Sequence, residues 1–122
     1  MTESRNLRLV ASAVVATLLI LGTVYHFYSL DGLFGSIAAA AMDKGTVYAP
    51  GYTDRAFRRV APGMSEADVR ELLGEPLHVD ETRWGTVIWS YSKSPSDASY
   101  RYRNVVLESG RVVRIRHGLY LD

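Results

Sequence analysis

Residues that could carry out chemistry are few in this chain, and their spacing does not assemble a reactive site. The three histidines, His26, His78 and His117, are too far apart for the local His-x-x-x-His or His-Glu-x-x-His spacing of a metal site, and there is no cysteine. No Gly-x-Ser-x-Gly elbow marks a nucleophilic serine. The sequence therefore predicts no enzyme, no metal site and no catalytic residues.

Binding of a nucleotide or a nucleic acid is not indicated either. The glycines form no phosphate-binding loop and no dinucleotide fingerprint, so we expect no cofactor. The net charge is only +1, and the aromatic residues do not follow an RNA-binding pattern. We expect no nucleic-acid partner.

The clearest concentration of one charge lies on two predicted strands, residues 100–108 and 111–117, joined by a two-residue turn at Ser109 and Gly110. Counting outward from this turn places one set of side chains on the core face: Tyr102, Asn104, Val106, Glu108, Arg111, Val113, Ile115 and His117. The other set then forms an exposed face of arginine and aliphatic side chains: Arg101, Arg103, Val105, Leu107, Val112, Arg114 and Arg116. This composition favours a protein-docking face. The alternative is that the arginines only keep the sheet soluble and cover it with their stems.

The elements that would position this face begin with two short helices. Ser65 can cap a helix over residues 66–73, and Asp68 occupies the capping-box position. Val69, Leu72 and Leu73 form its apolar stripe, and Gly74 and Pro76 end it. A preceding helix over residues 55–61, capped by Thr53 or Asp54, is separated from it only by the turn at residues 62–64, which predicts a packed helix pair.

The strand-forming residues after Pro76 predict the second layer. Residues 83–91 alternate and contain Trp89 and Tyr91, which we place on the core face, and residues 77–83 and 92–99 are predicted as loops. Two helices covering three strands give an α+β fold, a small two-layer ααβββ domain over residues 53–122.

The amino-terminal part predicts a membrane anchor. Residues 9–30 contain no Asp, Glu, Lys or Arg and reach roughly 33 Å as a helix, which is enough to cross a bilayer. Arg5 and Arg8 precede the span and Asp31 follows it, so residues 1–8 are placed in the cytoplasm and the later residues across the membrane. The alternative is a cleaved signal peptide, but the apolar run is longer than is usual for one.

Residues 31–52 are predicted as a juxtamembrane segment and tether. Residues 32–42 are apolar but too short to span a second time, so they either prolong the helix or lie along the membrane surface. A protein partner beside the membrane could bury their apolar side equally well. Residues 43–52 turn to Gly, Pro, Thr and Tyr, which indicates a short tether before the domain.

The motifs of the domain resemble those of the SmpA/OmlA family, whose members include the outer-membrane assembly lipoprotein BamE. The resemblance covers residues 57–116 and rests on a helix start, a helix end and a strand: Gly63, Met64 and Ser65, then Val69, Leu73, Gly74 and Pro76, then Trp89 and Tyr91. It implies an ααβββ fold similar to that of β-lactamase inhibitor proteins, and a role in binding other proteins rather than catalysis. Members of the family carry an acylated cysteine, which this chain lacks, so the resemblance implies an inner-membrane protein with its domain in the periplasm.

Three hypotheses follow for function. The first is a membrane-anchored protein-interaction module, an accessory subunit or assembly factor of an envelope or inner-membrane complex. The second is an inhibitor or sensor that binds an enzyme or a cell-wall ligand through loops 77–83 and 92–99. The third is that the transmembrane helix itself is the contact and the domain only braces it.

Overall fold

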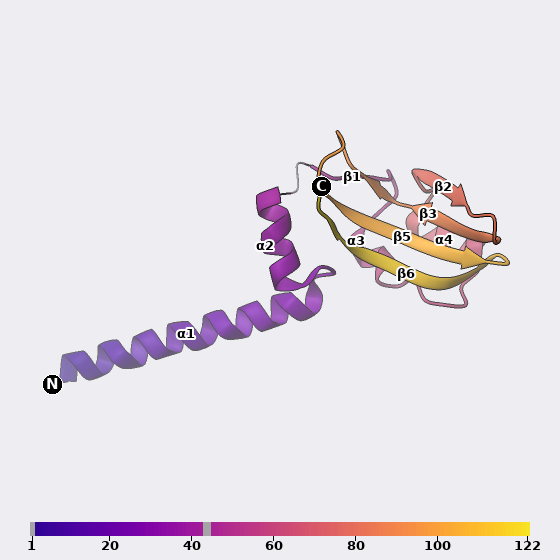
Figure 1. Ribbon diagram of the computed structural model, residues 1–122. Helices are drawn as coiled ribbons and strands as arrows, with labels where there is room; N and C mark the ends of the chain where they lie inside the picture. The colour runs from indigo at the N-terminus through magenta and orange to yellow at the C-terminus, as the bar shows by residue number, and fades with distance from the viewer. Residues whose placement is uncertain (1, 43–44) are drawn as a thin grey trace.

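The chain consists of a long helix, a shorter helix beside its end, and a small domain, as Figure 1 shows. The computed structural model describes residues 2–42 and 45–122; Met1 of the predicted cytoplasmic segment and residues 43 and 44 of the predicted tether lie outside the described residues. Helix α1 (Thr2–Tyr28) is long and apolar enough over Thr2–Phe27 to cross a membrane. An apolar amino-terminal helix was predicted over residues 9–30, and the structure confirms one that starts earlier and ends at Tyr28.

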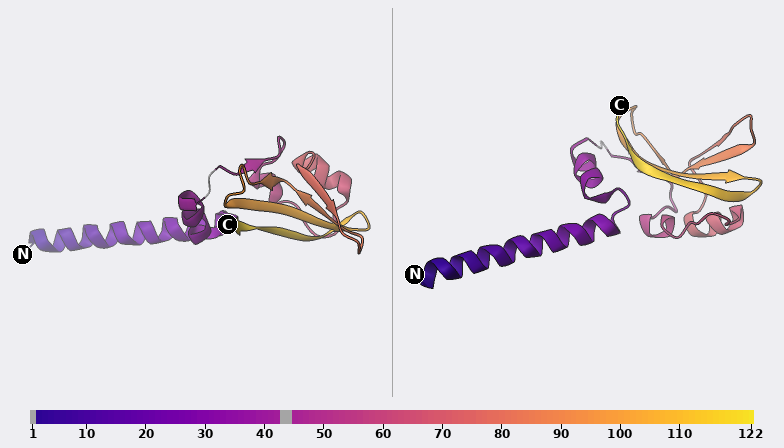
Figure 2. Two further views of the ribbon diagram at one scale, coloured as in Figure 1. Left: turned by 45° about the horizontal axis from the view of Figure 1, so that its top comes forward. Right: turned by 60° about the horizontal axis from the view of Figure 1, so that its bottom comes forward.

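Helix α2 (Gly32–Met42) does not prolong α1 but turns across its end (Figures 1 and 2). The turn is fixed by polar contacts, since the Leu33 N–H donates to His26 Nδ1 at 3.1 Å and the hydroxyls of Ser29 and Ser36 lie 2.9 Å apart. Gly32 has a φ of +70°, and a Cβ there would lie 2.9 Å from the His26 ring. Only glycine fits this corner without strain.

The domain is α+β, with two helices against an antiparallel sheet. Its sheet has the order β2-β3-β5-β6, and a separate two-stranded pair joins β1 to β4. The bounds are β1 (Val47–Tyr48), α3 (Asp54–Phe57), α4 (Glu66–Leu73), β2 (His78–Glu81), β3 (Thr86–Ser90), β4 (Ser92–Lys93), β5 (Tyr100–Glu108) and β6 (Arg111–Tyr120). Figure 2 shows α3 and α4 along one side of the sheet only.

The prediction of three strands was incomplete, because β2 lies in the predicted loop 77–83 and β4 in the predicted loop 92–99. All four side chains of β2 are exposed, so no apolar alternation marks it as a strand. It forms because its backbone pairs with β3, from His78 opposite Ser90 to Glu81 opposite Val87.

The start of α4 agrees with the prediction in detail, and its end agrees in position. Ser65 Oγ accepts from the Asp68 N–H at 3.2 Å, and Asp68 Oδ2 accepts from the Ser65 N–H at 3.1 Å, which completes the capping box. Val69 and Leu73 are fully buried, and Gly74 ends the helix with a φ of +73°. Its ψ of −162° lies outside the left-handed helical region that a glycine cap usually adopts.

The predicted faces of the β5–β6 hairpin were wrong. Val105, Leu107 and Val112 point toward α3 and α4 and belong to the buried core, together with Trp89 and Tyr91, which were placed there correctly. A β-bulge is the reason the predicted register fails. Leu107 is opposite Val112 as predicted, but Val106 is opposite Arg114, so Val113 is the extra residue and every later pair is shifted by one.

The predicted tether is, in its described part, packed against the domain. β1 pairs with β4, and Ala49 is buried in the core. The backbone of Gly51 lies against the end of α4, where a Cβ would meet the Leu73 carbonyl oxygen at 2.9 Å. The packed domain therefore begins before residue 53.

Candidate interaction surface

The seven residues predicted as a docking face do not share a face. Three of them, Val105, Leu107 and Val112, are core residues. Arg101 and Arg103 lie on the same side of the sheet as these three, where Arg101 is half-buried and Arg103 is fully buried. The remaining two, Arg114 and Arg116, are exposed and paired with Val106 and Asn104, so they lie on the side that the helices leave open.

The buried Arg103 joins the domain to the turn between α1 and α2. Its guanidinium donates two hydrogen bonds to the Asp31 carboxylate, at 3.1 and 2.8 Å, and a third to the carbonyl of Tyr102 at 3.0 Å. The side chains of Arg103 and Asp31 are 0% and 4% exposed. Such a bidentate pair, shielded from water, fixes both distance and orientation.

Two further groups complete this cluster. Asp54 Oδ1 lies 3.5 Å from Arg103 Nε and accepts a hydrogen bond from the Tyr52 hydroxyl at 2.6 Å. Burial by itself would lower the pKa of the Arg103 guanidinium, but its hydrogen bonds to Asp31 and the charge of Asp31 outweigh burial and raise that pKa. Burial, and then the hydrogen bond to Asp54, raises the pKa of the Tyr52 hydroxyl, so it keeps its proton and donates.

The cluster makes α1, α2 and the domain one connected structure. Asp31 precedes α2, and the neighbouring Leu30 packs against the domain core. Arg101 adds a second, longer contact to Asp31 at 3.8 Å. The position of the sheet relative to α1 is thus set by buried charge pairing rather than left to a flexible connection.

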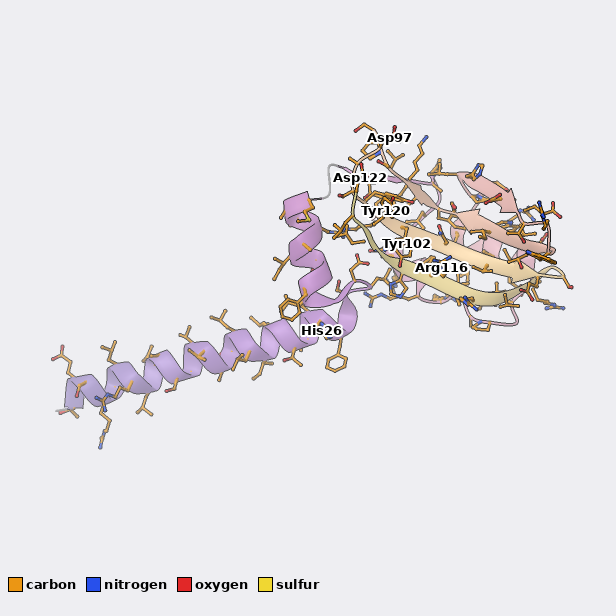
Figure 3. The ribbon with its side chains drawn as sticks, viewed as in Figure 1. His26, Asp97, Tyr102, Arg116, Tyr120 and Asp122 are labelled. Carbon is orange, nitrogen blue, oxygen red and sulfur yellow. The ribbon has the colours of Figure 1, made fainter. Side chains whose placement is uncertain are left out.

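The side of the sheet opposite α3 and α4, here called the open face, carries the exposed functional candidates. Its cross-strand rows are His78, Ser90, Asn104 and Arg116; Asp80, Ile88, Val106 and Arg114; Tyr102 and Gly118; and Tyr100 and Tyr120. Figure 3 shows Tyr102, Arg116 and Tyr120 on β5 and β6 from this side. The sign of the charge differs between the two edges of the open face, because Arg114 and Arg116 lie on β6 at one edge and Asp80 lies on β2 at the other.

A groove of about 670 Å³ lies at one end of the open face. The lining comes from the start of β2, from β3 and β4, from the loop after β4, and from the ends of β5 and β6 that meet there: Leu77, His78, Ser90, Ser92, Lys93, Ser94, Asp97, Ala98, Tyr100, Tyr120 and Asp122. The rings of Tyr100 and Tyr120 are 5.7 Å apart, and Ser94 Oγ bonds both the carbonyl and the N–H of Ala98, which closes the loop. Hydroxyls, one ammonium group and a tyrosine pair suit binding by hydrogen bonds and stacking.

Within the described residues, no three His, Asp or Glu side chains gather as metal ligands. The sequence did not indicate the partners of Arg103, which are Asp31, Asp54 and, through Asp54, Tyr52. The only signal in the sequence was that Asp31 is the first charged residue after the apolar run.

The motif residues lie where the helices meet the sheet. The Gly63 N–H donates to the Val112 carbonyl at 2.7 Å, and the Val112 N–H donates to the Met64 carbonyl at 2.9 Å. The Tyr91 hydroxyl donates to the Gly74 carbonyl at 2.9 Å, and the Arg70 guanidinium lies over the Trp89 ring at 4.5 Å. These residues build the fold and are not placed as a binding site.

Pro76, the last residue of the helix-end motif, is half-buried and lies between the end of α4 and the start of β2.

The chain matches no protein-family model, no curated protein and no solved structure.

Proposed function

We propose that this chain is a single-span membrane protein whose α+β domain is a non-enzymatic protein-interaction module of SmpA/OmlA (BamE-like) type. It serves as an accessory subunit or assembly factor of an envelope or inner-membrane complex. The amino terminus lies in the cytoplasm and the domain in the periplasm. The motif residues that carry the resemblance support this domain type, and the arginines that precede the span support the orientation.

The observation that carries the proposal is the buried Arg103–Asp31 pair. A domain that worked by diffusing on a tether would gain nothing from a desolvated ion pair at the base of its anchor. Here the pair holds the domain against the turn that follows α1 and leaves the open face uncovered. A fixed face beside a membrane suits a permanent neighbour in the same membrane.

The partner that fits is a membrane-complex protein with an acidic surface. Arg114 and Arg116 are both exposed and lie next to each other on one side of β6, beside the half-buried Ile88 and the buried Val106. No salt bridge holds either arginine among the described contacts, so both guanidinium groups can pair with carboxylates of a partner. Arginine beside aliphatic side chains is a composition enriched at protein interfaces.

The test is copurification in mild detergent after crosslinking in the native membrane. We expect the double variant Arg114→Glu/Arg116→Glu to lose the partner. The matched control is Arg55→Glu/Arg58→Glu, which reverses two exposed arginines at the helix side of the domain and should keep it. Recovery of the unaltered chain alone, or equal loss in both double variants, would contradict the proposal. Exchange of α1 for an unrelated span separates a contact made by the helix from one made by the domain.

The groove favours a second candidate, an inhibitor or sensor that binds an enzyme or a cell-wall ligand. Lys93, Asp97 and Tyr120 line it from three different segments, as a ligand site requires. In that case Lys93→Ala/Tyr120→Ala should abolish binding while Arg114→Glu/Arg116→Glu does not, and α1 should be dispensable in solution.

A further inference from the structure

Helix α2 leaves an apolar side uncovered, and this side needs an occupant. The helix contains no charged residue, and a helix that is apolar all round is normally buried. The domain covers the side of Ala39, which is 1% exposed, and α1 contacts the side of Leu33. On the opposite side of the helix from Ala39, Phe34 is 82% and Ile37 is 58% exposed.

The placement of α2 indicates what covers that side. In Figures 1 and 2, α2 stands across the carboxyl end of α1 with the domain on one side, while the length of α1 runs away from the domain. The side of α2 opposite the domain therefore faces the direction in which α1 extends. On the face of α1 that carries Gly22 and His26 and meets α2, the preceding residues at helical spacing, Val15 and Leu19, are exposed and apolar. The uncovered side of α2 therefore continues the surface with which α1 would meet lipid.

Several polar groups of the corner are paired with each other inside the chain. His26 Nδ1 accepts the Leu33 N–H, and the hydroxyls of Ser29 and Ser36 bond each other. These pairings lower the cost of placing the corner next to an apolar medium, and the remaining donors, one hydroxyl and the His26 Nε2–H, can bond water or lipid headgroups at the bilayer surface. With 11 residues, α2 is too short to span a bilayer but long enough to lie within its surface.

We propose that α2 is a membrane-surface helix that inserts Phe34 and Ile37 into the lipid and so holds the domain at a fixed height above the bilayer. This inference rests on the proposed membrane anchor. Insertion is driven by apolar area and not by charge, because α2 has no cationic side chain to attract anionic headgroups. Its depth should be shallow, roughly 5–10 Å into the boundary between headgroups and acyl chains.

The experiment places a fluorophore at single cysteines in the full chain, which has no cysteine of its own. The positions are Ile37→Cys on α2, Leu18→Cys in the middle of α1, and Ala67→Cys on the exposed side of α4 as the control in water. The labelled chains are reconstituted in phosphatidylcholine vesicles with or without phosphatidylglycerol. Quenching is measured with iodide, with a shallow spin-labelled lipid and with a deep one.

We expect the label at position 37 to be protected from iodide and quenched more by the shallow spin label, equally in both lipid mixtures. The label at position 18 should be quenched more by the deep one, and the label at position 67 by iodide. If position 18 is protected but position 37 is as open to iodide as position 67, the inference is overturned and the proposed anchor stands. If position 18 is also open, the proposed anchor fails.

A variant gives a second readout. Phe34→Glu/Ile37→Glu should move the domain away from the bilayer, measured as a loss of energy transfer from a label at Ala67→Cys to a lipid-bound acceptor. Both substituted positions are exposed, so the domain should keep its fold, checked by the fluorescence of the buried Trp89. Unchanged transfer with a folded domain overturns the inference.

Discussion

Replacing Arg103 by methionine should destabilise the domain more than any other single arginine substitution. The substitution leaves the Asp31 carboxylate, 4% exposed, without its bidentate partner. Removing one member of a buried ion pair costs about 3–5 kcal/mol because the remaining charge is uncompensated. Arg101 lies 3.8 Å from Asp31 and supplies part of the missing charge, so we expect the lower end of that range.

This loss is large on the scale of a small domain. Net stabilities are about 5–15 kcal/mol, and about 3 kcal/mol corresponds to a drop in the unfolding midpoint of roughly 12–24 °C for a domain of this size. The partner substitution Asp31→Asn should destabilise as well, since among the described residues it leaves Asp54, at 3.5 Å, as the one carboxylate near the Arg103 guanidinium. The double variant Asp31→Asn/Arg103→Met should be more stable than the sum of the single effects predicts.

Urea unfolding of the full chain in detergent measures these effects. Trp89 is 2% exposed and reports the core, whereas Trp84 is 86% exposed, so the series is made in a Trp84→Phe background. The matched control is Arg116→Met, the same change at an exposed position, which we expect to stay within about 0.5 kcal/mol. Equal midpoints for Arg103→Met and Arg116→Met, or strictly additive single effects, would refute the reasoning.

Three further predictions concern the packing of α4. Leu73→Ala removes a fully buried side chain and should lower the free energy of unfolding by about 2–5 kcal/mol in the same urea titration. Gly51→Ala forces a Cβ to within 2.9 Å of the Leu73 carbonyl and should cost about 1–3 kcal/mol; an unchanged midpoint would mean that the backbone contact yields freely. Two hydrogen bonds with Ser65 lower the pKa of the Asp68 carboxyl below its usual 3.8: the larger effect comes from the Ser65 N–H, and the smaller one from the Ser65 side chain. The stability that Asp68 supplies is therefore complete above pH 3.8 and lost as pH falls through its lower folded-state pKa, so Asp68→Asn should destabilise at pH 7 and converge with the unaltered chain in acid.

Local signals determined the parts of the fold that local physics controls. The capping box of Ser65 and Asp68 and the apolar stripe of α4 each depend on residues within one or two turns, so the printed order of residues is sufficient. The long apolar helix follows from composition alone. The two-residue turn at Ser109 and Gly110 likewise fixed the pairs Glu108–Arg111 and Leu107–Val112.

The faces of the hairpin could not be obtained in this way. An arginine in a strand predicts exposure, because an unpaired charge is too costly to bury. Arg103 is nevertheless buried, since Asp31, 72 residues away in the chain, approaches it with both carboxylate oxygens. A residue pattern that alternates by two also cannot reveal the bulge at Val113, which places Val112 and Ile115 on the same side of the sheet.

The sequence by itself thus determined a helix long and apolar enough to span a membrane, a capped helix and a strand hairpin, because each depends on neighbours along the chain. Only the tertiary structure decided which side of the sheet is open and how the long apolar helix meets the domain. The open side follows from the packing of α3 and α4 against Val105, Leu107 and Val112. The meeting of the long apolar helix with the domain depends on one long-range contact, in which Arg103, predicted to be exposed, pairs with Asp31, the first acidic residue after the apolar run. Arg103 and Asp31 meet only once the chain has folded, so no local pattern in the sequence predicts this ion pair or its contribution to stability.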